Sequence, residues 1–298
     1  MKTMALPPTL FVTGATGALG RLVIDALLET VPASSILAGV RDLDKHEKAA
    51  AAFRARNIEA RTADYTRPET LDRAFRDVDR LLLISSSENG KRKVQHRNVI
   101  EAARGAGVKL IAYTSILHAD TTPLMLAEEH RDTEAALRAS GVPFVLLRNG
   151  WYTEVYTWRL PTALAHGVLA GAAGDGRISS AARADYARAA ATVLTGDDHA
   201  GRIYELAGDA SFTLAELAAV VRAASGKPMV YRDMSTEAFR SAAIQAGVPE
   251  VVATIVSDTD AGVARGALFE DGGALRRLIG RPTTPFQQTI TDFVRAGS

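Results

Sequence analysis

The sequence predicts an α/β protein built on a Rossmann-type, doubly wound parallel sheet, with a smaller, mostly helical C-terminal lobe. Short apolar runs alternate with amphipathic stretches over the first half of the chain, a glycine-rich turn follows the first run, and the alternation loosens from Thr153 onward. Such alternation is typical of a parallel sheet with helices on both faces. We therefore expect a dinucleotide-binding Rossmann domain over 1–153 and a substrate-covering lobe over 154–298, with a segment near 185–206 that returns to the first domain.

The first predicted strand, 10–12, runs into the glycine-rich turn. Apolar residues then recur at helical spacing over 22–28, so the turn joins a strand to a helix. Glycines let such a turn approach a pyrophosphate, whose charge is attracted by the free N–H groups of the following helix. The spacing G-x-x-G-x-x-G differs from the common G-x-G-x-x-G, and an ordinary tight turn is the alternative. The expected phosphate-binding residues are Gly14, Ala15, Thr16, Gly17, Ala18, Leu19 and Gly20.

Arg41 follows the second predicted strand, 36–40, and lies 21 residues beyond Gly20. In dinucleotide-binding folds a side chain at this point contacts the adenosine ribose. An acid accepts a hydrogen bond from the 2′-hydroxyl of NAD, whereas an arginine holds the 2′-phosphate of NADP. Arg41 therefore favours NADP. Asp42 beside it leaves recognition of a hydroxyl open, and a surface arginine at a strand end is the structural alternative.

The next predicted strands end in polar or small side chains. Asp64 closes one of them and is expected to accept a hydrogen bond from an adenine amino group. Ser85, Ser86 and Ser87 follow another and are expected to line the cofactor. Ligands of open parallel sheets bind beyond the carboxyl ends of the strands, so these residues point to one crevice. The strands are expected over 59–65, 80–84, 109–115 and 144–147, with helices over 44–57, 68–78, 94–106 and 124–140.

The second half of the chain is expected to be mostly helical. No internal repeat, low-complexity segment or flexible linker separates it from the first half. The expected elements are a helix ending near 166, a glycine-rich loop over 171–177, a helix over 185–194, a strand over 203–206, an amphipathic helix over 212–224 and a short strand over 229–231.

Composition excludes several classes of function. The 298 residues are 47% apolar and carry a formal net charge of +1, so there is ample material for a core and no global field to gather nucleic acid or an anionic membrane. The absence of cysteine excludes disulfides and thiolate catalysis and is compatible with the cytoplasm. The six histidines show no metal-binding spacing, so no metal is expected. The composition leaves an oligomer open.

The motifs together resemble those of the NmrA-like, atypical short-chain dehydrogenases/reductases, and within them the NADPH-dependent quinone oxidoreductases. The similarity covers nearly the whole chain and includes the glycine turn, Arg41, 84–88, 95–100, 112–115 and 146–152. It implies that the glycine turn and Arg41 hold the adenosine end of NADPH. It also implies that Ser87, Asn149, Gly150, Trp151 and Tyr152 border the nicotinamide end and the acceptor, with Asn149, Trp151 and Tyr152 contacting the substrate.

The usual carbonyl-reducing pair of the superfamily is missing. None of the seven tyrosines has a lysine four residues further on, and His130 stands at the position that resembles the family's lysine. Reduction of a ketone leaves a strongly basic alkoxide and needs a positioned acid. Hydride addition to a quinone leaves a phenolate whose conjugate acid has a pKa near ~10. The missing pair therefore favours hydride transfer to quinones or similar planar acceptors, with Tyr152 and His130 as candidate proton donors.

Several alternatives stay open at this point. Trp151 either forms a flat wall for the acceptor or packs in the core, and His130 either contacts the cofactor ribose or lies exposed on a helix. The loss of the tyrosine and lysine also fits an NADP(H)-binding redox sensor that regulates a partner without turnover. Reduction of cationic triphenylmethane dyes is a further possibility that the resemblance implies.

Overall fold

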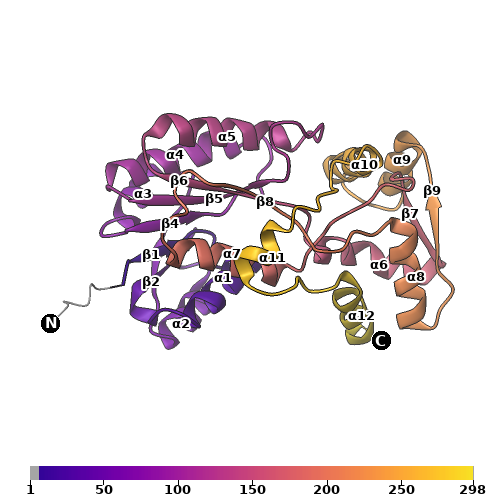
Figure 1. Cartoon of the computed structure of the whole chain (residues 1–298), viewed down its shortest axis with the longest axis horizontal. Helices are drawn as coiled ribbons and strands as arrows, with labels where there is room; N and C mark the ends of the chain where they lie inside the picture. Colours follow the sequence, from indigo (N-terminus) through magenta and orange to yellow (C-terminus); the bar gives the residue numbers. More distant parts are fainter. Residues whose placement is uncertain (1–6, 298) are drawn as a thin grey trace. The chain divides into compact units, whose positions relative to one another are not determined.

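The computed structural model describes residues 7–297 and divides the chain into two compact units. Unit 1 contains the residues up to Ser115 together with Glu129–Arg148 and Tyr186–Tyr204. Unit 2 contains Ile116–Glu128, Asn149–Asp185 and the residues from Glu205 onward (Figure 1). The chain thus passes between the units several times, and the domain limits expected from the sequence stay a prediction.

Unit 1 is built on a seven-stranded sheet with the order β3-β2-β1-β4-β5-β6-β8. The pairs β1–β2, β1–β4, β2–β3 and β4–β5 are parallel. The inner strands are buried along almost their whole length, which explains their uninterrupted apolar sequences. The strands are β1 (Leu10–Val12), β2 (Ile36–Val40), β3 (Glu59–Thr62), β4 (Arg80–Leu83), β5 (Leu110–Ile116), β6 (Phe144–Asn149) and β8 (Ile203–Leu206).

Helices cover both faces of this sheet. Figure 1 shows α3, α4 and α5 on one face and α1, α2 and α7 on the other. The fold class expected from the sequence, a Rossmann-type doubly wound sheet, is therefore confirmed. The helices are α1 (Ala18–Leu28), α2 (Glu47–Ala55), α3 (Pro68–Ala74), α4 (Arg92–Gly105), α5 (Ala127–Ser140) and α7 (Arg183–Thr195), with a 3-10 turn at Ala33–Ser35.

The strand order places a topological switch point between β1 and β4. From β1 the chain adds β2 and β3 on one side, and from β4 it continues on the other side. In sheets of this kind the helices on the two sides diverge at the carboxyl ends of the central strands and leave a crevice. The segments that follow β1, β2, β3 and β4 are therefore the ones positioned to form a binding site.

Unit 2 combines a two-stranded parallel sheet with helices. β7 (Val168–Gly171) pairs with β9 (Val230–Asp233). β9 corresponds to the short strand expected over 229–231, whereas β7 was not expected. The helical elements are two 3-10 turns, Thr153–Val155 and Thr157–Arg159, followed by α6 (Leu160–His166), α8 (Leu214–Ser225), α9 (Thr236–Gln245), α10 (Glu250–Ala264), α11 (Ala274–Ile279) and α12 (Phe286–Ala296).

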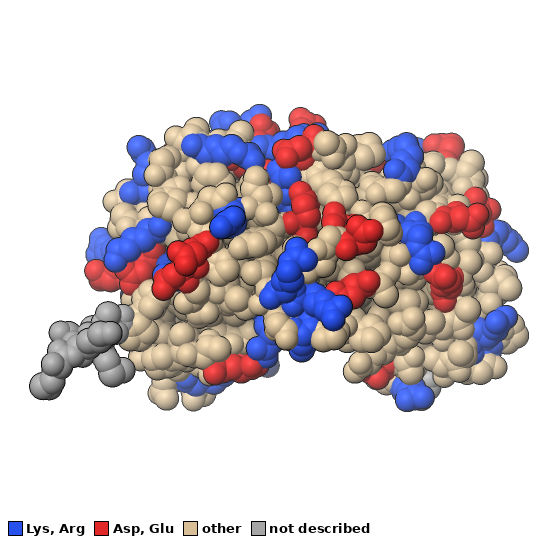
Figure 2. Space-filling model, viewed as in Figure 1, with Lys and Arg blue, Asp and Glu red and all other residues tan. Residues whose placement is uncertain are grey.

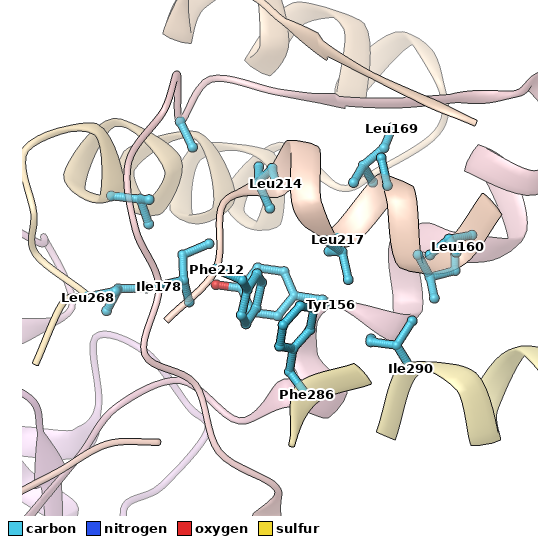
Figure 3. Close-up of a cluster of buried hydrophobic side chains, with 14 of the residues drawn as sticks. Tyr156, Leu160, Leu169, Ile178, Phe212, Leu214, Leu217, Leu268, Phe286 and Ile290 are labelled. Atoms are coloured by element: carbon cyan, nitrogen blue, oxygen red, sulfur yellow. The ribbon is translucent and has the colours of Figure 1, made fainter. Parts of the chain in front are cut away.

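Aromatic and aliphatic side chains form the core of unit 2 (Figure 3). Phe212 stacks on Phe286 with ring centroids 4.0 Å apart, and Tyr156 meets Phe212 edge to face at 5.8 Å. Helix α8, which contributes Leu214 and Leu217, begins with a capping box in which Thr213 and Glu216 satisfy each other's backbone N–H groups. The mostly helical C-terminal part is therefore a packed unit with a core of its own.

The surface of the molecule fits the small net charge. Figure 2 shows basic and acidic side chains interspersed over the face in view. Across residues 7–297, no helix has the length and apolar character that a membrane span requires. In the same part of the chain, no three histidine or acidic side chains are grouped as metal ligands.

Candidate cofactor-binding site

The glycine-rich turn connects β1 to α1 through a backbone that tolerates few side chains. Gly14 has a φ of +56°, in the left-handed region that disfavours residues with a Cβ. A Cβ on Gly20 would collide with the carbonyl oxygen of Gly14, because the first turn of α1 packs directly against the loop. The two outer glycines are therefore required by the path of the chain.

The N-terminus of α1 has neither a capping side chain nor an acidic residue of its own. Its N-cap residue, Gly17, makes no side-chain cap, and the first turn of the helix contains no acidic residue. Arg21 donates from Nε to the carbonyl oxygen of Thr16 at 2.8 Å, which holds the loop in place. The backbone N–H groups at this end of an eleven-residue helix are thus available to bind an anion.

A cavity of about 400 Å³ opens over this helix end in unit 1. It is lined by the segments that follow β1, β2, β3 and β4, as the switch point requires. Of the cofactor residues expected from the sequence, four are not among the lining residues, namely Ala15, Asp64, Asn149 and Gly150. The lining residues are Gly14, Thr16, Gly17, Ala18, Leu19, Gly20, Arg41, His46, Ala63, Tyr65, Ile84, Ser85, Ser86 and Ser87.

Arg41 reaches the cavity from the end of β2 and pairs with an acid from another loop. Its guanidinium lies 2.7 Å from Glu88 Oε1, and both side chains are partly exposed. Asp42 is engaged elsewhere, since its Oδ1 accepts from the backbone N–H groups of Asp44 and Lys45 at 3.1 Å. The acid beside Arg41 is therefore Glu88, whereas the sequence had drawn attention to Asp42.

Tyr65 and Thr13 support the floor of the cavity. The Tyr65 hydroxyl donates to Ile84 O at 2.9 Å and lies 2.5 Å from Thr13 Oγ1, which in turn accepts from the Ile84 N–H at 2.9 Å. Burial raises the pKa of the Tyr65 phenol, so it stays protonated. These side chains tie together the ends of β1, β3 and β4.

Ser86 is held at the cavity by two buried side chains from α4. His96 Nε2 accepts from the Ser86 N–H at 3.0 Å, and Arg92 Nε donates to the Ser86 carbonyl oxygen. Burial, and then the charge of Arg92, lower the pKa of His96 to about 3, so its imidazole is neutral and can accept this hydrogen bond. Thr133 contacts the other ring nitrogen at 2.9 Å. Both backbone polar groups of Ser86 are thus fixed from within unit 1.

His130 lies inside unit 1, in the same buried polar cluster. Its Nδ1 is 2.7 Å from the Tyr113 hydroxyl and its Nε2 is 3.3 Å from Arg92. Burial, Arg92 and His96 hold the pKa of His130 well below its usual value. The stable imidazole is neutral, which does not favour His130 as a proton donor, and the alternative of an exposed helix histidine is wrong, since only 6% of the residue is exposed.

Asp64 caps its own turn. Its Oδ1 accepts from the backbone N–H and the hydroxyl of Thr66, at 2.9 and 2.8 Å. Its neighbours Ala63 and Tyr65 line the cavity in its place. The expected contact of Asp64 with an adenine amino group stays a prediction.

Of the residues expected at the nicotinamide end and the acceptor, Ser87 belongs to unit 1, whereas those from Asn149 to Tyr152 belong to unit 2. Asn149 is 7% exposed, and its Oδ1 has no hydrogen-bond partner within residues 7–297. The Gly150 N–H donates to Leu206 O at 2.7 Å. Trp151 is half-buried and packs against the core cluster of unit 2, in line with the packing alternative.

Tyr152 lies among polar groups of unit 2. Its ring is covered by the Arg183 guanidinium at 5.0 Å, and its phenol is hydrogen-bonded to Asn149. Burial raises the pKa of Tyr152, and the contacts with Asn149 and Arg183 offset part of that effect. The phenol is therefore protonated near neutral pH and retains a proton that it can donate.

Sequence reasoning missed four of the residues that line the cavity, namely His46, Tyr65, Ile84 and Ala63. Three of them adjoin residues that were expected, because they belong to the same strand ends. His46 gave no signal as an isolated histidine, although it lies only five positions after Arg41.

This combination of a doubly wound sheet, an uncapped helix N-terminus and an arginine at the end of β2 is that of a dinucleotide-binding protein. A family described as NAD(P)H-binding matches residues 14–197, more than half of the chain. The chain therefore belongs to the NAD(P)H-binding family.

Particular relatives narrow this assignment. Quinone oxidoreductase 2 of Escherichia coli strain K12 is 51% identical over 94% of this chain and 96% of its own length. A crystal structure of the NADPH-dependent quinone oxidoreductase QOR2 from that species, complexed with NADPH, covers 95% of this chain and 99% of its own, with a TM-score of 0.92. An NmrA-like family domain-containing oxidoreductase of Aspergillus flavus is 30% identical over 94% of this chain and 92% of its own length. The resemblance to NmrA-like oxidoreductases is thus confirmed.

Proposed function

We propose that this protein is an NADPH-dependent oxidoreductase that transfers a hydride to quinones or similar planar acceptors. The observation that carries the proposal is the cavity of unit 1, which combines the uncapped N-terminus of α1 with Arg41. The similarity to quinone oxidoreductase 2 over almost the full length of both chains supports the choice of acceptor.

The residues of the cavity match the parts of the cofactor. The backbone of Gly14–Gly20 and the N–H groups of α1 receive the pyrophosphate, and Arg41 receives the 2′-phosphate. Ser86 and Ser87 line the cavity further along the same edge. When bound, the nicotinamide supplies the hydride that the acceptor takes up.

The acceptor end is assigned to Asn149, Gly150, Trp151 and Tyr152 on the basis of the family resemblance. Two features of unit 2 support this assignment. The buried Oδ1 of Asn149 is an unpaired acceptor, which an N–H group of a carboxamide would satisfy. The protonated phenol of Tyr152 is a proton source for the phenolate that hydride addition to a quinone leaves.

The proposed setting is the cytoplasm, with small molecules as ligands. A chain without cysteine suits a reducing compartment, and the balanced charge gives no reason to expect nucleic acid or a membrane surface as partner. The oligomeric state does not enter the proposal.

The function is tested by following the absorbance of NADPH with a benzoquinone or a naphthoquinone as acceptor. We expect NADPH to be consumed only when the acceptor is present, with one NADPH oxidised per quinone reduced. The competing candidate, a redox sensor suggested by the missing tyrosine and lysine, would bind NADPH but show no decay that depends on an acceptor. A cationic triphenylmethane dye in the same panel tests the third possibility.

Arg41→Ala tests the cofactor assignment separately from the acceptor. Hydrogen bonds to a charged group contribute about 1.5–3 kcal/mol, so we expect the dissociation constant for NADPH to rise about ten- to a hundredfold while that for NADH changes little. Arg56→Ala is the matched control, because Arg56 is a partly exposed arginine of unit 1 that also pairs with an acid, Asp25. Equal effects of Arg41→Ala on both nucleotides would refute the role of Arg41.

A further inference from the structure

Glu88 forms an ion pair with Arg41, the residue to which the proposed function assigns the 2′-phosphate of the cofactor. We propose that the Glu88 carboxylate competes with that phosphate for Arg41 and thereby limits the preference of the protein for NADPH over NADH. The proposal rests on the proposed function, in which Arg41 receives the 2′-phosphate. It assigns Glu88 as a residue that determines cofactor specificity.

The carboxylate of Glu88 is oriented by groups other than Arg41. Its Oε1 lies 2.7 Å from the Arg41 guanidinium, while its Oε2 accepts from Gln95 Nε2 at 3.1 Å and lies 3.5 Å from Lys91 Nζ. The backbone N–H of Glu88 donates to Ser86 Oγ at 3.1 Å. Glu88 is therefore held by several groups besides Arg41.

That loop is itself anchored. His96 and Arg92 fix both backbone polar groups of Ser86, two residues before Glu88. The backbone of the loop is therefore restrained close to Glu88. Arg41, in contrast, is an exposed side chain at the end of β2, so it is the partner that moves from the carboxylate to the phosphate.

The exchange affects the two cofactors differently. NADPH brings a phosphate to Arg41 and must break the ion pair with Glu88, whereas NADH carries a hydroxyl at the same position and leaves the ion pair intact. Glu88 thus weakens NADPH binding selectively. Because partly exposed ion pairs are weak, the competition is expected to change the affinity for NADPH only about two- to fivefold.

The experiment compares Glu88→Gln with the unaltered protein, using the fluorescence of bound NADPH and NADH to obtain both dissociation constants. Glutamine keeps the shape of the side chain and removes its charge. We expect the variant to bind NADPH about two- to fivefold more tightly and NADH with unchanged affinity. Glu29→Gln is the matched control, since Glu29 also pairs with an arginine of unit 1, Arg188, and does not line the cavity.

The outcomes separate this inference from the proposed function. Unchanged or weaker binding of NADPH by Glu88→Gln, or equal tightening of both nucleotides, would overturn the inference. In an Arg41→Ala background the gain in NADPH affinity from Glu88→Gln should disappear, because there is no arginine for which the carboxylate and the phosphate could compete. A gain that persists in this background would also overturn the inference. If Arg41→Ala alone leaves the preference for NADPH intact, it is the assignment of Arg41 that fails.

Discussion

At the scale of single residues, the cofactor cradle depends on glycines that the chain path requires. Gly20 is the most constrained of them, because a Cβ there would meet the backbone of Gly14 and Ala15 rather than a side chain that can move aside. The loop must therefore shift to admit any other residue. Such a shift changes the backbone N–H groups on which an anion would rest.

Gly20→Ala is expected to weaken binding of NADPH and NADH to the same extent, by about tenfold or more. Both nucleotides share the pyrophosphate, and misplacing its backbone donors removes charge-assisted hydrogen bonds worth about 1.5–3 kcal/mol. Titration with both nucleotides checks this. Gly105→Ala is the control, since a Cβ on Gly105 would meet no neighbouring atom within 4 Å. A selective loss of NADPH alone would contradict the role of this loop.

Some residues of the cavity could be predicted from the sequence, and others could not. The glycine turn and Arg41 were found because each follows directly after an apolar strand, where the chain order alone fixes its place. Glu88 was not found as the partner of Arg41, because an ion pair between residues 47 positions apart depends on the paths of two loops. Asp64 is the opposite case. Its contact with the cofactor was expected from its position at the end of a strand, but its carboxylate accepts hydrogen bonds from Thr66 in the local turn.

At the scale of elements, helix α4 positions the loop that follows β4. The helix presents His96 to the backbone N–H of Ser86 and Arg92 to its carbonyl oxygen, inside a polar cluster that includes Thr133 from α5. These side-chain contacts with the backbone restrict the loop without any contact to a ligand. His96 is therefore a positioning residue.

His96→Ala is expected to raise the Michaelis constant for NADPH with a smaller effect on the turnover number. The substitution leaves the buried Ser86 N–H without an acceptor, which costs about 1–3 kcal/mol and frees the loop beside the cofactor. His96→Gln provides an acceptor of similar reach and should restore most of the affinity. If both variants lose turnover equally and the Michaelis constant stays constant, the positioning role is refuted.

The inner strands of unit 1 were predictable because burial on both faces gives a strand an uninterrupted apolar sequence. The helices were predictable because burial of one face gives a helix a periodic apolar sequence. Strand β7 of unit 2 was missed for a physical reason. Its four residues, Val168–Gly171, are buried alternately and run straight into a glycine-rich segment, so they carry too little pattern to separate from the loop. Their pairing with β9 comes from a partner about sixty residues away.

At the scale of the whole molecule, unit 1 carries a built-in sensitivity to acid. The pKa values of its buried histidines, His96 and His130, lie far below the pKa of a histidine in the unfolded chain, which is about 6.5. Below that pH the unfolded chain binds protons that the folded unit excludes. Stability therefore falls as the pH drops, over the range from about 6.5 towards the folded pKa of about 3 for His96.

Each of the two histidines is expected to lower the free energy of unfolding by about 1.4 kcal/mol for every pH unit well below 6. Both tryptophans, Trp151 and Trp158, belong to unit 2, so their fluorescence does not report directly on unit 1. Hydrogen exchange of peptides that cover β4 and α4, measured at pH 7 and pH 5, is the appropriate measurement. His96→Gln should reduce the difference between the two pH values, and His46→Gln, at an exposed position, should leave it unchanged.

The surface position of Arg41 and Glu88 has a consequence for evolution and for protein engineering. Neither side chain belongs to a core cluster of either unit, and the pair they form is partly open to solvent. Substitutions there carry little risk to folding, unlike changes at Gly20 or His96. With the roles proposed for Arg41 and Glu88, we expect the preference between NADPH and NADH to be adjustable by substitutions at these two positions, so that redesign for NADH can begin at this pair.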